Sequence, residues 1–178
     1  ADCRGCRSLA CAPRRGRVRL SAMRSLSSLP LAAGAAMRGV LADIDDTVST
    51  DGRITAEAYA AMENLHDAGL LLIPITGRPA GWCDHIARMW PVDAVVGENG
   101  ALYMIHDRAA RRLRKRYAAT EAERADNRRR LDEVAASILR EVPGAALASD
   151  QPYRESDLAI DFCEDVPRLP DDSIDRII

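Results

Sequence analysis

The chain has 178 residues, a formal net charge of −2 and a hydrophobic content of 47%. Its length fits one ordinary domain or part of a larger protein of two domains. The hydrophobic content is ample for a core and excludes global disorder, whereas a net charge near zero identifies no class of partner. Lys115 is the only lysine, so any mechanism that needs a lysine has one candidate.

The N-terminal residues differ in composition from the rest of the chain. Residues 3–42 contain no acid but many arginines and serines, which is typical of an organellar transit peptide or of translated upstream sequence. We favour the second interpretation and expect residues 1–37 to be a disordered or artefactual extension. Cys3, Cys6 and Cys11 have no fourth ligand at a suitable spacing, so we expect an unstructured tail rather than a metal site.

The number of cysteines and the length of the apolar runs indicate where in the cell the protein is expected. Five cysteines, an odd number with no signal peptide, point to a reducing compartment, and we expect a cytoplasmic protein. Cys83 and Cys163 are expected to pack as small hydrophobic side chains. The run "LPLAAGAAM" is too short to span a bilayer and no longer apolar run occurs, so no membrane partner is expected.

The first regular elements are a strand, a helix and a second strand. The apolar run 39–44 has the length of a buried strand. Thr55 is placed to cap a helix over 56–68, and Gly69 supplies its end. The run 70–75 predicts the second buried strand.

A further helix and two more strands follow. The helix is predicted to begin near Pro79 and to end at Pro91, with Trp82 and Trp90 packed in the core. Residues 93–105 predict a third strand, a break and a fourth strand. Strands that alternate with helices indicate a parallel sheet with right-handed crossovers, whose functional site lies at the carboxyl ends of the strands.

The later part of the sequence is more heavily charged. Apolar residues at helical spacing mark one face of the stretch 123–142, and short strands are expected within 144–149 and 156–162. The last residues, from Asp171 onward, resemble the first turns of a helix. This part is therefore expected to form a second, smaller α+β unit that is incomplete.

Two acids stand at the end of the first predicted strand. Asp43 and Asp45 are two residues apart, so both side chains project to one side while Ile44 points into the core. Two carboxylates placed together need a cation or a proton, and their position suggests Mg²⁺, which takes few carboxylates and keeps water and phosphate oxygens as other ligands. One carboxylate can then attack phosphorus, and the other can protonate the leaving oxygen.

The second predicted strand ends in Thr76-Gly77-Arg78. A hydroxyl group and a free backbone N–H at this position can hold phosphate oxygens. Each motif alone is weak. Each one ends its own buried strand, however, and the strands are one helix apart, so both motifs arrive at the same edge of the sheet.

Together these residues resemble the haloacid dehalogenase (HAD) phosphatase superfamily. The segment "DIDDT" is similar to its first motif and "ITGRP" to its second. The segment "GENGA" (97–101) resembles one seen in type-IIB members, such as sucrose-phosphate phosphatases and eukaryotic phosphomannomutases, which carry an α/β cap. The resemblance implies an α/β fold in which residues 38–107 form part of a Rossmann-like HAD core, with a smaller α+β cap, incomplete, at 108–178.

The resemblance also implies a role for each matching residue at the two strand ends. Asp43 would be the nucleophile and a ligand of Mg²⁺. Asp45 would be the general acid and base, and it would give the metal its backbone carbonyl. Thr76 and the Gly77 amide would bind the phosphoryl group.

Other residues are assigned to the surroundings of that site. Arg78 and Asn99 are expected to shape the site floor or the route to the cap. Arg154 is placed in the substrate region of the cap, although an ion pair with Asp157 is the stronger interpretation. For Asp46, a site acid and a turn acid stay open as alternatives.

The sequence departs from the superfamily pattern after these motifs. A lysine that screens the nucleophile and further acids of the Mg²⁺ site are expected after the cap, and neither occurs in a credible place. Lys115 lies in a basic stretch and is expected on a solvated face, and the acids of "PDDSID" (170–175) fit the first turn of a helix. We therefore expect a fragment, cut within or just after the cap, with weak or no catalysis.

The function expected from these residues is that of a Mg²⁺-dependent phosphatase of small phosphorylated metabolites, with sugar phosphates as one class, acting through an aspartyl-phosphate. A phosphomutase of the same family and a non-catalytic remnant stay open as alternatives. Nucleic-acid binding by the arginine-rich region 108–130 is disfavoured, because acids are interleaved and no aromatic platform accompanies them. The oligomeric state stays open.

Overall fold

The computed structural model describes residues 28–30 and 34–178. The chain divides into two units, Ala1–Ala36 and Met37–Ile178. The second unit holds every element discussed below. The expectations for the N-terminal extension, including its three cysteines, lie almost entirely outside the described residues.

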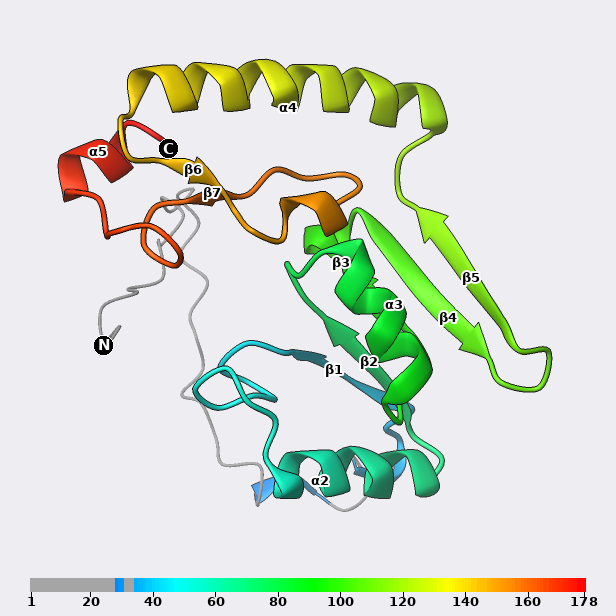
Figure 1. Ribbon diagram of the computed structural model, residues 1–178. Coiled ribbons are helices and arrows are strands. Elements are labelled where there is room, and N and C mark those ends of the chain that lie inside the picture. The colour runs from blue at the N-terminus through cyan, green and yellow to red at the C-terminus, as the bar shows by residue number, and fades with distance from the viewer. Residues whose placement is uncertain (1–27, 31–33) are drawn as a thin grey trace. The chain divides into compact units, whose positions relative to one another are not determined.

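The centre of the second unit is a five-stranded sheet in the order β1-β2-β3-β4-β5. The first three strands run parallel, and the last two pair antiparallel with their neighbours. This mixed sheet with its helices confirms the predicted α/β class (Figure 1). The strands are β1 (Gly39–Asp43), β2 (Leu71–Ile75), β3 (Val95–Gly97), β4 (Leu102–Asp107) and β5 (Arg112–Tyr117).

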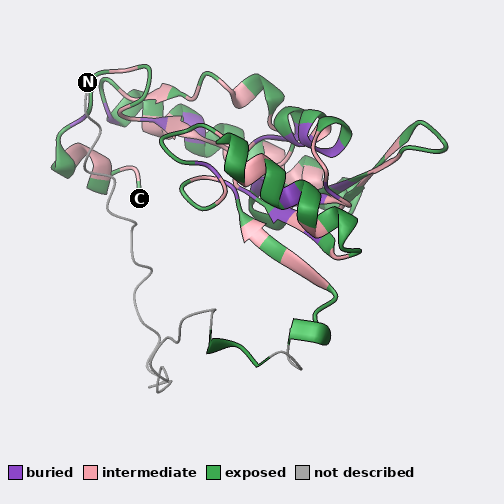
Figure 2. Ribbon diagram, turned by 90° about the horizontal axis from the view of Figure 1, so that it is seen from below, coloured by how far each residue is buried: buried purple, intermediate pink, exposed green. Residues whose placement is uncertain are grey.

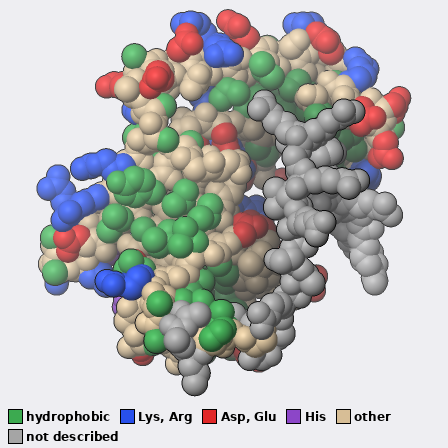
Figure 3. Space-filling view, turned by 180° about the vertical axis from the view of Figure 1, so that it is seen from behind, with side chains coloured by type: hydrophobic (Ala, Val, Ile, Leu, Met, Phe, Trp, Pro, Cys, Tyr) green, Lys and Arg blue, Asp and Glu red, His purple; other side chains and the backbone are tan. Residues whose placement is uncertain are grey.

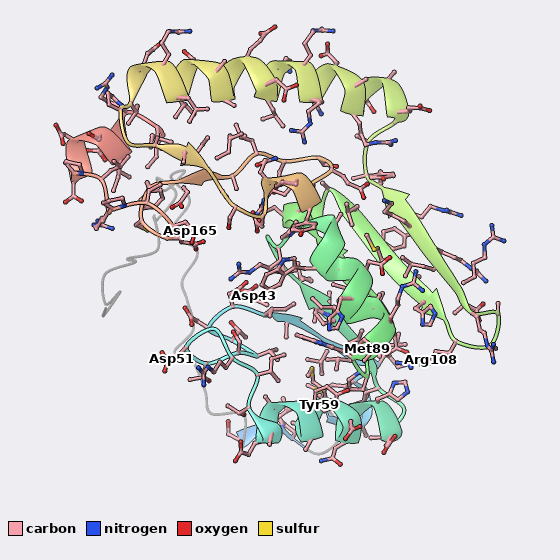
Figure 4. All side chains as sticks on the ribbon, in the orientation of Figure 1. Asp43, Asp51, Tyr59, Met89, Arg108 and Asp165 are labelled. Atoms are coloured by element: carbon pink, nitrogen blue, oxygen red, sulfur yellow. The ribbon has the colours of Figure 1, made fainter. Side chains whose placement is uncertain are left out.

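Helices α2 (Ala56–Asp67) and α3 (Ala80–Met89) connect the parallel strands. Thr55 caps α2 as predicted, since its Oγ1 accepts a hydrogen bond of 3.2 Å from the N–H of Ala58. Pro79 occupies the N-cap of α3, where the missing N–H breaks no helical hydrogen bond. The two helices are joined directly where the hydroxyl of Tyr59 donates to the carbonyl of Met89 at 3.2 Å (Figure 4).

The core lies between these helices and one face of the sheet. Figure 2 shows the buried residues concentrated in the part of the molecule where helices cover the strands. Along β1, β2 and β4, every second side chain points into this core, as the period of a strand requires. The buried hydrophobic residues of the cluster include Ile44, Met62, Leu72, Cys83, Ile86, Val95, Leu102 and Met104.

The opposite face of the sheet is exposed and apolar. Leu41 is 64% exposed and Leu71 is 50% exposed, so the prediction that both runs form fully buried strands is wrong for their alternate side chains. A continuous apolar run indicates a strand but does not say which of its faces is covered. Figure 3 shows hydrophobic side chains gathered on this side of the molecule; the exposed apolar residues of the strands are Leu41, Leu71, Ile75, Tyr103 and Ile105.

The prediction that both tryptophans of α3 pack in the core holds in part for Trp90 and is wrong for Trp82. Ile86 and Cys83 are buried beneath the helix, whereas Trp82 is 47% exposed and Trp90 is only partly buried. The helical spacing predicted that Trp82 lies on the apolar side of α3. It did not predict the cavity between Trp82 and the loop that follows β1. Cys83 packs as a small hydrophobe, as expected, and burial and then the charge of Glu98 raise the pKa of its thiol to about 12.

The remaining chain forms the expected long helix and short strands. Helix α4 (Glu121–Glu141) begins with a capping box between Thr120 and Glu123. Strands β6 (Ala146–Leu147) and β7 (Ile160–Asp161) pair antiparallel. Two single turns, η2 (Glu98–Gly100) and η3 (Gln151–Tyr153), and helix α5 (Asp171–Asp175) complete the elements.

Strand β5 belongs to the central sheet. It pairs along its full length with β4, so the sheet extends past residue 107, where the cap was expected to begin. The division into core and cap otherwise stays a prediction. Among the described residues, no helix is both long and apolar enough to cross a membrane.

Candidate active site

Asp43 lies at the carboxyl end of β1 (Figure 4). Its side chain is exposed, and its Oδ1 accepts a hydrogen bond of 2.8 Å from the N–H of Ile44. Ile44 is buried in the core, as the alternation of strand side chains predicts. Asp43 is paired with Ile75 across the parallel ladder, so the end of β1 lies directly beside the residue that precedes Thr76.

Asp45 is held by Arg78. The Nη2 of Arg78 lies 2.7 Å from Oδ1 of Asp45, and its Nε donates to both carboxylate oxygens at 3.2 and 3.1 Å. This hydrogen bonding raises the pKa of Arg78, although its partial burial acts in the opposite direction. The guanidinium also lies 4.8 Å from the ring centroid of Trp82. Arg78 therefore lies beside Asp45 and places a positive charge next to its carboxylate; its assignment to the site floor stays a prediction.

The turn after β2 brings Thr76 and Gly77 to the same sheet edge. Thr76 is buried, and its Oγ1 accepts a hydrogen bond of 3.0 Å from the N–H of Arg78. A Cβ at position 77 would lie 3.0 Å from the Oδ1 of Asn99, so this close approach favours glycine. The hydroxyl of Thr76 thus holds the backbone of Arg78, the residue that pairs with Asp45.

Asn99 stands opposite Gly77 in the turn η2. Its φ is +56°, a conformation that asparagine adopts more readily than most residues. Its backbone N–H donates to the carbonyl of Thr76 at 3.2 Å, and its side-chain amide donates to Asp157 at 3.4 Å. Asn99 therefore links the predicted phosphate loop to the segment after η3.

Arg154 reaches the same loop from the other side. Its side chain is only 10% exposed, it pairs with both Asp150 and Asp157 at 3.0 Å, and it donates to the carbonyl of Gly77 at 3.0 Å. Burial lowers the pKa of Arg154, but the two carboxylates outweigh that effect and raise it overall. The ion pair that the sequence favoured over a substrate contact is present.

Glu98 is a further site-edge residue to which the sequence assigned no role. It is 2% exposed, and its carboxylate accepts hydrogen bonds from the backbone N–H of Ala80, Glu155, Ser156 and Asp157 at 2.6–3.1 Å. It thereby joins the first turn of α3 to the segment after η3. The available signal was its position directly after a buried strand, at the same edge as Asp43 and Thr76.

Lys115 also differs from the prediction of a solvated basic face. Its Nζ lies 2.6 Å from the Glu155 carboxylate and 5.4 Å from the ring centroid of Tyr117. Tyr117 donates its hydroxyl to the same carboxylate. Burial raises the pKa of Glu155, but these two partners outweigh it and hold that pKa below its ordinary value. The single lysine is thus engaged in holding the segment after η3.

The acids that follow the strand end fit turns. Asp46 and Asp51 both have positive φ, +56° and +50°, and both are exposed. Aspartate is among the few residues enriched in this conformation. Asp51 lies between Thr50 and Arg53, whose backbones are bridged. These positions favour the turn-acid alternative for Asp46, and Asp51 occupies a turn of the same kind.

The strand end offers few protein ligands for a metal. Across residues 28–30 and 34–178, no group of three or more His, Cys, Asp or Glu side chains is arranged to hold an ion. The Asp43 carboxylate and the Asp45 carbonyl are nevertheless the hard oxygen donors that Mg²⁺ prefers, and Mg²⁺ is commonly bound through one or two carboxylates plus substrate phosphate. The residues present therefore fit that ion.

Part of the chain matches a known protein family. Residues 40–124 match the family described as haloacid dehalogenase-like hydrolase. A crystal structure of protein 0175 from Thermoplasma acidophilum is similar to the chain with a TM-score of 0.56 at 15% identity, covering 79% of this chain and 55% of that one. This likeness shows the fold alone. No curated protein matches the chain.

Two other solved structures are similar at a TM-score of 0.42. One is BT1666 from Bacteroides thetaiotaomicron, described as a phosphatase of the HAD superfamily, at 24% identity over 69% of this chain and 42% of that one. The other is a haloacid dehalogenase-like hydrolase from B. subtilis, at 21% identity over 57% and 34%. The chain spans about half or less of the length of these structures. The match to the haloacid dehalogenase-like hydrolases covers residues 40–124, the part of the chain that holds β1 to β5 and the start of α4.

Proposed function

We propose that the protein is a Mg²⁺-dependent phosphatase of small phosphorylated metabolites. The observation that carries the proposal is the register of β1 and β2, which pairs Asp43 with Ile75. The exposed carboxylate of Asp43 thereby lies beside the turn that contains Thr76 and Gly77, the residues proposed to bind the phosphoryl group. A cytoplasmic location, expected from the cysteines, forms part of the same proposal.

In the proposed reaction, a carboxylate oxygen of Asp43 attacks the phosphorus and the bond to the leaving oxygen breaks. Thr76 and the Gly77 amide hold the phosphoryl oxygens, and Asp45 gives a proton to the leaving group. Asp45 then takes a proton from water, which attacks the aspartyl-phosphate and releases inorganic phosphate. Mg²⁺ held by the Asp43 carboxylate and the Asp45 carbonyl would supply positive charge near the phosphoryl oxygens.

The ion pair between Asp45 and Arg78 sets a condition on this reaction. Arg78 contacts both oxygens of the Asp45 carboxylate. Asp45 must therefore carry its proton on a lone pair outside that contact, or the guanidinium must move, before Asp45 can act as the acid. The same guanidinium lies at the sheet edge where a phosphoryl group would arrive, and it contributes positive charge there.

Hydrolysis of p-nitrophenyl phosphate by the full-length protein tests the proposal. We expect activity with Mg²⁺, loss of activity with EDTA, and a fall on the order of 10³-fold or more for Asp43→Asn, because the amide is a poor nucleophile. Asp51→Asn is the matched control, since it changes another exposed aspartate to a residue that tolerates its positive φ.

Unchanged activity in Asp43→Asn would rule out the assigned nucleophile. Activity that persists in EDTA would rule out the metal. Transfer of phosphate to a sugar instead of water would favour the phosphomutase alternative.

A further inference from the structure

A cavity of about 480 Å³ lies between the loop that follows β1 and one face of α3. We call it the tryptophan cavity; its lining includes Ile44, Asp45, Ile54, Trp82, Ile86 and Trp90. Its volume falls within the usual range for a small-molecule site, and such sites are mainly apolar with a few polar groups. Both tryptophans of the sequence line this single cavity.

Of the four polar side chains in the lining, Asp45 and Arg78 pair with each other and Ser49 bonds to backbone groups, while His85 is the fourth. Asp45 and Arg78 form the ion pair at 2.7 Å. The hydroxyl of Ser49 donates to the carbonyl of Ile44 at 3.0 Å. A ligand with many hydroxyl groups would therefore lose hydrogen bonds to water without gaining equivalent partners here, which is unfavourable. An aromatic or other planar apolar group has no such requirement.

The rings of α3 are suited to a planar group. Trp82 and Trp90 are the largest side chains of the lining, and Trp82 is 47% exposed, so a ligand can bury apolar surface against it. The Arg78 guanidinium already stacks on that ring with 4.8 Å to the centroid. This stacking places a cation beside the aromatic surface, where the phosphate of an aryl ester would lie.

Asp45 connects the cavity to the proposed reaction. A general acid must lie within hydrogen-bonding distance of the leaving oxygen, and Asp45 lines the cavity. The organic group bonded to that oxygen therefore extends into the cavity. We infer that the substrate is a phosphate monoester of an aromatic or planar apolar alcohol, whose organic group binds in the tryptophan cavity; this inference rests on the proposed phosphatase function.

Ligand binding to the full-length protein tests the inference without requiring turnover. We expect phenyl phosphate to change the intrinsic tryptophan fluorescence saturably, and to bind at least about tenfold more tightly than glucose 6-phosphate. In calorimetric titrations, Trp82→Ala should weaken phenyl phosphate about tenfold while inorganic phosphate binds as before. Trp82→Leu, which keeps apolar volume, should weaken it less.

Met89→Ala is the matched control on the same helix, because Met89 is exposed and is not part of the lining. It should bind phenyl phosphate as the unsubstituted protein does. Equal affinity for the two esters, no saturable change in fluorescence, or an equal loss in Met89→Ala and Trp82→Ala would overturn the inference.

Hydrolysis is measured in parallel to separate the two proposals. Tight binding of phenyl phosphate without its hydrolysis would overturn the phosphatase proposal and with it the assignment of a substrate, while the cavity would remain an aryl-phosphate site. Preferential hydrolysis of glucose 6-phosphate would overturn the inference and leave the phosphatase proposal intact.

Discussion

Two regions at the same edge of the sheet use acidic side chains in opposite ways. Asp43, at the end of β1, is exposed and accepts a hydrogen bond from the adjacent Ile44. Glu98, after β3, is 2% exposed and accepts four backbone hydrogen bonds from two distant segments. An ionised carboxylate has about four lone-pair sites. Those of Glu98 are filled, so it holds structure, whereas Asp43 keeps sites for a ligand or a reaction.

The two arginines of these regions differ in the same way. Arg78 contacts one carboxylate and one aromatic ring, and about a third of its side chain is exposed. Arg154 is nearly buried between two carboxylates and a carbonyl. The region around Asp43 is thus open to ligands. The region around Glu98 holds the segment after η3 in contact with α3 and with the turn after β2.

Glu98→Ala should have the largest effect on stability. It leaves four backbone N–H groups without their acceptor, and we expect the free energy of unfolding to fall by about 3–5 kcal/mol. Asp43→Asn should change it by less than about 1 kcal/mol, because that side chain is exposed. Urea denaturation followed by circular dichroism measures both values.

Glu63→Ala provides the control for the loss of a glutamate, since Glu63 is exposed on α2. It should stay within about 0.5 kcal/mol of the unsubstituted protein. Glu98→Gln keeps one acceptor oxygen but turns an amide N–H₂ toward N–H donors, so an intermediate loss is expected. Equal stability of the Ala variants at positions 98 and 63 would contradict the contrast between the two regions.

Arg154→Met should have the next largest effect. It removes the partner of Asp150 and Asp157, both of which are mostly buried, and we expect a loss of about 2–3 kcal/mol in the free energy of unfolding. Arg129→Met is the matched control, because that arginine is 68% exposed and pairs with Asp126 on the surface. Its loss should be below about 1 kcal/mol. Similar losses in the two variants would show that the Arg154 network does not stabilise the fold.

The sequence predicted the features that depend on neighbouring residues. The apolar runs located β1 and β2, and Thr55 located the start of α2 through a hydrogen bond to Ala58, three residues away. The two motifs at Asp43 and Thr76 were placed at one sheet edge because parallel strands end on the same side. These predictions succeeded because strand period, capping and crossover direction are local or topological rules.

Contacts between distant residues account for what the sequence did not predict. Glu98 binds backbone groups 57–59 positions away, and Lys115 binds Glu155, 40 positions away. In β5, the partly buried Lys115 and Tyr117 alternate with the exposed Arg114 and Arg116, as the two-residue period of a strand requires. From the sequence, this stretch was predicted to be a solvated basic face. Because most residues of β5 are basic, no alternation of apolar and polar residues was visible in the sequence.

The smallest predicted effect concerns Asp161, a second acid that is held by backbone N–H groups. Its carboxylate accepts hydrogen bonds of 2.8–2.9 Å from Cys163, Glu164 and Asp165 (Figure 4 labels Asp165). Burial raises the pKa of Asp161, but these hydrogen bonds outweigh it and hold that pKa below 3.8. The unfolded chain therefore takes up this proton at a higher pH than the folded protein does.

Because the folded protein binds this proton only at a lower pH than the unfolded chain does, Asp161 makes the free energy of unfolding fall as the pH falls. The stabilisation by Asp161 is fully present above pH 3.8 and is lost as the pH falls from there through the lower pKa of the folded state. Asp161→Asn should cost about 1–2 kcal/mol at pH 7, and the difference in urea midpoint between the two proteins should narrow below pH 3.8. A difference that stays constant with pH would show that packing, rather than the ionised carboxylate, gives Asp161 its effect.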